Sequence, residues 1–79
     1  MRVLYCHPVE GRGDRKAVAF LDVELTPDVR LYGLRLVRQP DGRHMVYAPQ
    51  AGQRRVATFS KPLAQSITDA AVAALEAAR

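Results

Sequence analysis

Residues 17–49 read AVAFLDVELTPDVRLYGLRLVRQPDGRHMVYAP, and this stretch decides the fold. Aliphatic, β-branched and aromatic residues recur in it at two-residue spacing, which is typical of half-buried strands. Residues 26–28 (TPD) and 39–42 (QPDG) interrupt the pattern with proline and Asp-Gly, which supply the backbone angles of tight turns. The stretch therefore predicts a three-stranded antiparallel meander.

The limb after the first turn changes its phase half-way along. Before Tyr32 and Gly33, the leucine of this limb stands at an odd position, 31. After them, the leucines stand at the even positions 34 and 36. A β-bulge at Tyr32 and Gly33 would bring the leucines to one face, because glycine tolerates the bulge conformation. We therefore predict a bulge there, with Arg35 on the opposite face.

The segments on either side of the meander extend the sheet. Residues 2–8 alternate as a first strand, with Val3 and Tyr5 on one face, and a proline ends this strand or confines it to a sheet edge. Residues 10–16 are polar and glycine-rich, as in a hairpin loop. Residues 54–59 follow a further turn and predict a short fifth strand or an extended lead-in.

Residues 61–78 predict a C-terminal helix. Ser60 or Lys61 can cap it, and Pro62 suits the first turn, where its missing N–H is not needed. Leucine, isoleucine and alanine recur beyond it at three- and four-residue spacing, which gives one broad apolar stripe. The sequence therefore predicts an α+β fold, an antiparallel β-meander of four to five strands followed by one C-terminal α-helix. The strands are expected at about residues 2–8, 16–25, 29–38, 43–48 and 54–59.

The chain of 79 residues is short for a stable core without further support. Its one cysteine, Cys6, allows no intrachain disulfide. Cys6, His7 and His44 are its only cysteine and histidine residues, which is too few for the usual set of about four ligands of a structural zinc site. We therefore expect a single domain over residues 1–79 that gains stability by oligomerisation and holds no metal or cofactor.

The charge balance is basic: twelve Lys and Arg residues stand against eight Asp and Glu, a formal net charge of +4. This balance favours a polyanionic partner such as nucleic acid. The apolar run at the N-terminus is far too short for the apolar region of a signal peptide or for a membrane span. The sequence therefore predicts a cytoplasmic protein without a membrane partner.

The sequence contains no catalytic constellation. Asp28 and Asp41 stand in turns, where aspartate has a local backbone role. Cys6 and His7 are neighbours in a strand and therefore point to opposite faces, which excludes a nucleophile–base pair. No glycine-rich loop lies between a strand and a helix to hold a nucleotide. We expect the protein not to be an enzyme and to have no small-molecule substrate.

The basic residues fall into three groups. They are Arg12, Arg15 and Lys16 in the first loop, Arg35, Arg38 and Arg43 around the second turn of the meander, and Arg54, Arg55 and Lys61 before the helix. Adjacent arginines at the start of a helix can neutralise phosphates, and the helix N-terminus adds partial positive charge. A solvated basic rim is the equal alternative. Tyr5, Tyr32 and Tyr47 could stack on unpaired bases, although packing in the core or at an interface is the stronger expectation for each.

Several short motifs follow one another along the chain. They are AFLD (19–22), YGLRLV (32–37), DG (41–42), MVYAP (45–49), ATFSKPL (57–63) and ITDAAV (67–72). In this order and spacing they resemble the SpoVG family, the small bacterial septation and sporulation regulators, over about residues 17–75. The chain departs from the family in two places: Arg54 and Arg55 are the only basic residues in a short segment after Pro49, and residues 64–66 at the helix start carry no charge.

The resemblance implies an α+β domain and a homodimer. It also implies a regulatory role in which the protein binds DNA or RNA and tolerates many different target sites. The leading hypothesis is therefore a non-enzymatic dimeric regulator that binds nucleic acid through a basic surface. The candidate binding residues are Arg54, Arg55 and Lys61, with Arg35, Arg38 and Arg43 as a second patch. The alternative is a protein-interaction or structural dimer module with no nucleic-acid affinity. A third and remote option is a small-molecule or metal binder that uses Cys6, His7 and His44.

Overall fold

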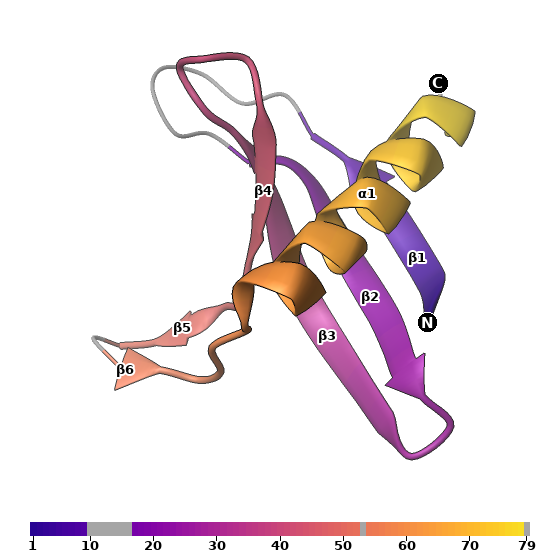
Figure 1. Ribbon diagram of the computed structural model, residues 1–79, viewed down its shortest axis with the longest axis vertical. Coiled ribbons are helices and arrows are strands. Elements are labelled where there is room, and N and C mark those ends of the chain that lie inside the picture. Colours follow the sequence, from indigo (N-terminus) through magenta and orange to yellow (C-terminus); the bar gives the residue numbers. More distant parts are fainter. Residues whose placement is uncertain (10–16, 53, 79) are drawn as a thin grey trace.

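The computed structural model describes residues 1–9, 17–52 and 54–78 (Figure 1). Its elements are β1 (Arg2–Pro8), β2 (Ala17–Thr26), β3 (Val29–Arg38), β4 (His44–Tyr47), β5 (Gln50–Ala51), β6 (Arg54–Arg55) and α1 (Lys61–Ala77). Strands β1 to β4 form one antiparallel sheet in chain order, and β5 pairs with β6 in a separate two-stranded hairpin. The predicted α+β fold, a meander followed by one helix, is confirmed.

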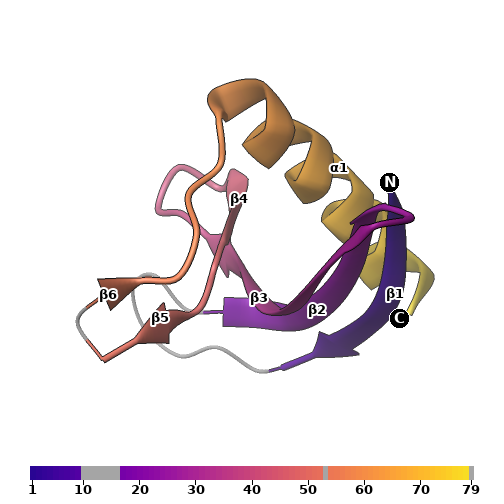
Figure 2. The ribbon, with the colours of Figure 1, turned by 90° about the horizontal axis from the view of Figure 1, so that it is seen from below.

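Helix α1 lies across one face of the four-stranded sheet, so the main body of the molecule has two layers (Figure 2). We call the sheet face under α1 the inner face and the opposite face the outer face. The buried residues between the layers are Ala19, Leu21, Val23, Leu34, Leu36, Val46, Ile67, Ala71 and Leu75. They alternate along β2 and recur every four residues along α1. The apolar stripe of the helix therefore packs on the apolar face of the meander.

The predicted bulge in β3 is confirmed. Tyr32 and Gly33 together oppose the single residue Asp22 of β2. Gly33 has a φ of +70°, a conformation that residues with a side chain rarely adopt, and its N–H donates to Asp22 Oδ1 at 3.0 Å. The leucines on both sides of the bulge consequently share the inner face, and Arg35 lies on the outer face.

A second irregularity lies in β1, and it makes one expectation wrong. Val3 pairs with Val23 and Tyr5 pairs with Asp22, so Leu4 is an extra residue between the two pairs. Val3 therefore packs against the core, whereas Tyr5 belongs to the outer face and is exposed. Strict alternation had placed Val3 and Tyr5 on one face, but an inserted residue reverses the phase of a strand.

The fifth strand is much shorter than the expected span of residues 54–59. Only Arg54 and Arg55 form a strand, and they pair with β5 instead of joining the main sheet. The edge of β4 that faces away from β3 has another partner. There the backbone N–H of Val46 donates to the buried hydroxyl of Thr68 in α1 at 3.0 Å. Since the helix takes a hydrogen-bonding position of this edge, residues 56–59 run on to α1 without forming a strand.

The start of α1 shows which residue caps it. Ser60 has an extended conformation, and its hydroxyl accepts from the N–H of Leu63 at 3.4 Å, while Pro62 occupies the first turn. Among the described residues, no helix is both long and apolar enough to span a bilayer.

Candidate functional site

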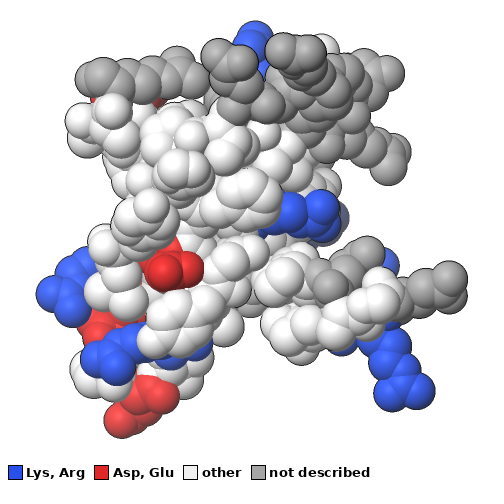
Figure 3. All heavy atoms as spheres, turned by 180° about the vertical axis from the view of Figure 1, so that it is seen from behind, with Lys and Arg blue, Asp and Glu red and all other residues white. Residues whose placement is uncertain are grey.

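The outer face of the sheet carries large aromatic side chains that are open to solvent. The exposed fractions are 56% for Tyr5, 40% for Phe20, 63% for Tyr32 and 43% for Tyr47. Figure 3 views this face and shows a broad uncharged area with charged side chains mostly at its margins. These aromatic residues are therefore not part of the core of this chain, whereas packing at an interface, which was also expected for the three tyrosines, stays a prediction.

One line of residues crosses the outer face from β1 to β4. His7 is the register partner of Phe20, Phe20 of Arg35, and Arg35 of Tyr47. Directly opposed residues of neighbouring strands lie side by side on the same face, so these four side chains form one row. We call it the outer row. At its β1 end, the ring of Tyr5 stacks on His7 with a centroid distance of 6.2 Å and an interplanar angle of 6°.

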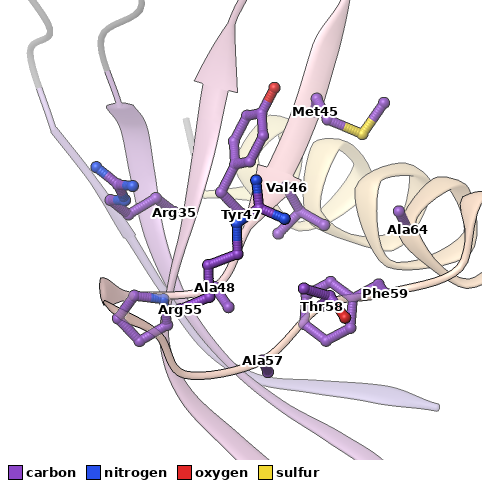
Figure 4. Close-up of a pocket in the computed structure, with 11 residues that line it drawn as sticks. Arg35, Met45, Val46, Tyr47, Ala48, Arg55, Ala57, Thr58, Phe59 and Ala64 are labelled. Atoms are coloured by element: carbon purple, nitrogen blue, oxygen red, sulfur yellow. The ribbon is translucent and has the colours of Figure 1, made fainter. Parts of the chain in front are cut away.

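The β4 end of the outer row opens into a groove of about 500 Å³ between β4 and the segment that leads to α1. Figure 4 shows Arg35, Tyr47 and Arg55 around one part of this groove, with Phe59 and Ala64 toward α1. The described residues that line it include two arginines and no acidic residue. Two like charges around one hollow without a carboxylate create a site that favours an anion.

Tyr47 lines two hollows. Its hydroxyl accepts a hydrogen bond from Gln39 Nε2 at 3.1 Å. The second hollow, of about 530 Å³, is lined by Val37, Gln39 and Pro40 together with Arg35 and Tyr47. Arg35 and Tyr47 therefore face both hollows.

Arg35 is the half-buried cation of this site. Its Nε atom is enclosed, and within the described part of the chain it has no hydrogen-bond partner. The ion pairs among the described residues involve other arginines: Arg2 and Arg30 contact Glu24 at 3.3 Å, and Arg43 contacts Asp41 at 3.8 Å. A buried polar donor without a partner is uncommon. Arg35 also lines the groove, and a guanidinium has further N–H groups that can donate to an anionic oxygen.

The structure separates the six predicted binding residues into different places. Arg55 and Arg35 line the same groove, although the sequence had assigned them to different groups. Arg54 is exposed on β6 and is not among the residues that line the groove, because neighbouring strand residues point to opposite sides. Lys61 is exposed at the first position of α1.

The remaining two residues of the second patch lie away from the groove. Arg38 is exposed at the end of β3. Arg43 pairs with Asp41 and lines a different hollow, between the β3–β4 turn and α1, together with Gln65 and Asp69. Their roles stay predictions. The basic group of the first loop, Arg12, Arg15 and Lys16, lies outside the described residues.

The sequence analysis did not recognise Phe20 and Gln39 as parts of the site. Phe20 joins Arg35 and Tyr47 only through strand register, and Gln39 joins Tyr47 through a hydrogen bond across the turn. The signal that could have found Phe20 is its position one residue out of phase with the buried residues of β2. That position places an aromatic ring on the outer face.

The three residues considered as metal ligands do not come together as a site. Cys6 packs against the core from the inner face, where burial raises the pKa of its thiol, whereas His7 belongs to the outer row. Over residues 1–9, 17–52 and 54–78, no three His, Cys, Asp or Glu side chains cluster to hold a metal ion.

Comparison of the chain with protein-family models, with curated proteins and with solved structures finds no match. The resemblance to the SpoVG family therefore remains an inference from the motifs, and the geometry of the site carries the functional argument.

Proposed function

We propose that this protein binds DNA or RNA without catalysis, through the groove formed by Arg35, Tyr47 and Arg55. The observation that carries the proposal is the convergence of two arginines from separate strands on a groove in which no acidic residue is found among the described lining residues. Arginine donates in a planar fork that matches the oxygens of a phosphate. An aromatic ring beside the two guanidinium groups adds a surface for a base.

Two further features support a nucleic-acid partner. The formal net charge of +4 attracts a polyanion to the whole molecule. The resemblance of the motifs to the SpoVG family implies that a homodimer binds DNA or RNA in a regulatory role. We include the homodimer and the regulatory role in the proposal. Phosphate contacts position a protein without reading sequence, so we expect binding that tolerates many sequences and weakens with salt.

A protein-interaction dimer is the second candidate function, and the exposed aromatic residues of the outer face favour it. Tyr5, Tyr32 and Tyr47 would then be covered by a second copy or by another protein. This candidate predicts a stable complex without affinity for DNA or RNA. Native mass spectrometry of the purified protein, with and without added oligonucleotide, separates the two.

The decisive experiment is a fluorescence anisotropy titration with a labelled mixed-sequence pool of DNA and RNA. The double variant R35Q/R55Q should lose at least about tenfold in affinity at low salt, because two phosphate contacts are removed. The slope of log K against log salt should fall by about two, since each lost contact removes about one.

The matched control is the double variant R2Q/R30Q, which removes the same positive charge from a pair of arginines that contact Glu24. It should change the affinity much less than R35Q/R55Q. Absence of binding at low salt, or an equal loss in both double variants, would contradict the proposal.

A further inference from the structure

We infer that the outer face binds single-stranded nucleic acid by stacking unpaired bases on Phe20 and Tyr47, with Arg35 at the intervening phosphate. This inference rests on the proposed function and narrows it from nucleic acid in general to unpaired strands. It adds Phe20 of β2 to the groove site, whose described lining residues come from β3, β4 and the chain between β4 and α1, together with Ala64 of α1.

The outer row places a cation between two aromatic residues. Phe20, Arg35 and Tyr47 are consecutive register partners on β2, β3 and β4. Neighbouring strands lie about 4.8 Å apart, so the two aromatic residues are separated by about 10 Å with the guanidinium between them. Aromatic, cation, aromatic is the order that a base, its phosphate and the next base require.

The rings of Phe20 and Tyr47 are accessible and partly supported by their surroundings. Phe20 and Tyr47 are each about two-fifths exposed, at 40% and 43%, so part of each side chain is accessible while the rest is packed. The hydrogen bond from Gln39 holds the hydroxyl of Tyr47 in place. A ring that is already fixed loses little conformational entropy when a base stacks on it.

The surface around Tyr47 is concave. Tyr47 lines hollows of about 500 and 530 Å³, and Arg35 lines both. Concave sites of this size commonly hold a small flat ligand. The bases of a duplex are paired and stacked on one another, so they cannot enter such hollows. Unpaired bases can be splayed onto aromatic side chains, and protein modules with a four-stranded antiparallel sheet use this mode.

Charge is distributed unevenly over the outer face. The β3–β4 half carries Arg35 and leads to Arg55, and no acidic residue is found among the described residues that line their groove. Toward the β2–β3 turn the same face carries Asp22 and Glu24, and Glu24 pairs with both Arg2 and Arg30, so positive and negative groups balance there. An anionic strand is therefore favoured along the outer row over the area near Tyr32, which lies beside Asp22 at the bulge.

The test compares single-stranded and duplex probes in anisotropy titrations. The probes are labelled oligo(dT) and oligo(rU) of about twelve nucleotides, within the site sizes seen for single-strand binders, and a DNA hairpin duplex of similar length. We expect the wild-type protein to bind the single strands at least about tenfold more tightly than the duplex. Bases that stack on tyrosine should also quench its intrinsic fluorescence.

The variants Phe20→Leu and Tyr47→Ala should each weaken single-strand binding by roughly tenfold, and Phe20→Leu, which lies outside the groove, should leave duplex binding nearly unchanged. Tyr47→Phe should keep single-strand affinity within about twofold, since the ring that stacks is retained. Phe20→Leu preserves an apolar side chain of similar bulk, so folding is protected. Tyr32→Ala is the matched control: it removes an exposed tyrosine from the same face but outside the outer row, and should have no effect.

The outcomes distinguish this inference from the proposed function. Equal binding of single strands and duplex, with no effect of Phe20→Leu or Tyr47→Ala, overturns the stacking surface and leaves the nucleic-acid proposal standing. No binding of any probe at low salt overturns both. A loss in Tyr32→Ala equal to that in Tyr47→Ala also overturns the outer row as the binding surface.

Discussion

The two faces of the sheet are built from the same strands but differ in what they bury. On the inner face, Ala19, Leu21 and Val23 are fully buried beneath α1. On the outer face, Phe20 stands between two of these residues in sequence and is 40% exposed. Aliphatic side chains close one face, and aromatic side chains remain accessible on the other. The inner face therefore stabilises the fold, while the outer face is available for a partner.

The largest expected effect comes from comparing neighbours on the two faces. Leu21→Ala should lower the free energy of unfolding by about 2–5 kcal/mol, because it leaves a cavity in a small core. Phe20→Ala should cost about 1 kcal/mol or less, since much of its ring is already in water. Urea denaturation followed by far-UV circular dichroism measures both. Equal losses would show that the outer face is as important to stability as the inner face.

The contact between α1 and β4 offers the next test of the inner face. The hydroxyl of Thr68 accepts from the N–H of Val46 at 3.0 Å and donates to the carbonyl of Ala64 at 2.7 Å. Thr68→Val should cost about 1–3 kcal/mol, because the buried N–H of Val46 loses its partner.

Thr68→Ser retains the hydroxyl and is the control for this effect. It should recover most of the loss seen in Thr68→Val when both are measured by thermal unfolding. A valine variant as stable as the wild type would mean that the edge of β4 does not depend on this hydrogen bond.

The bulge in β3 keeps the two faces separate, and it depends on Gly33. A Cβ atom at this position would meet no atom within 4 Å, so a substitution acts through the positive φ alone. Gly33→Ala should cost about 1–2 kcal/mol. Gly33→Asn should cost less, because asparagine tolerates the left-handed region better. Midpoints of thermal unfolding will rank the three proteins, and an asparagine variant less stable than the alanine variant contradicts this account.

The smallest expected effect is a shift in the pH dependence of alkylation at Cys6, whose neighbour His7 lies on the other face. Burial disfavours the thiolate and raises the pKa of the Cys6 thiol. The rate of alkylation by iodoacetamide should therefore reach half of its maximum at a higher pH in the native protein than in urea. A lower midpoint in the native protein would indicate that a base activates Cys6, which the separation of the two faces argues against.

The sequence predicted much of the fold because the fold depends on local patterns. The two-residue period of β2, the turns and the apolar stripe of α1 each follow from neighbouring residues. The bulge at Gly33 was also predictable, because a change of phase beside a glycine is typical of a bulged strand. The extra residue Leu4 in β1 was missed, because no glycine or turn residue marks it.

The site was less predictable than the fold. Arg35 and Arg55 were both named as candidates, but in different groups and with Arg54 and Lys61 as the closer neighbours of Arg55. The groove that Arg35 and Arg55 share depends on the path of the chain after β4. Along that path α1 occupies a hydrogen-bonding position at the edge of β4, and none of the described residues adds a fifth strand to the sheet there. That competition between a helix and a strand for one edge is a tertiary effect.

The sequence by itself determined the antiparallel meander, its helix, the basic charge and the separation of leucines from Arg35 at the bulge. Those features follow from interactions between residues that are close in the chain. Only the tertiary structure decided that Phe20, Arg35 and Tyr47 form one row and that Arg55 faces the same groove. Register and strand edges join residues that are distant in sequence, and periodicity within a single segment carries no information about such pairs.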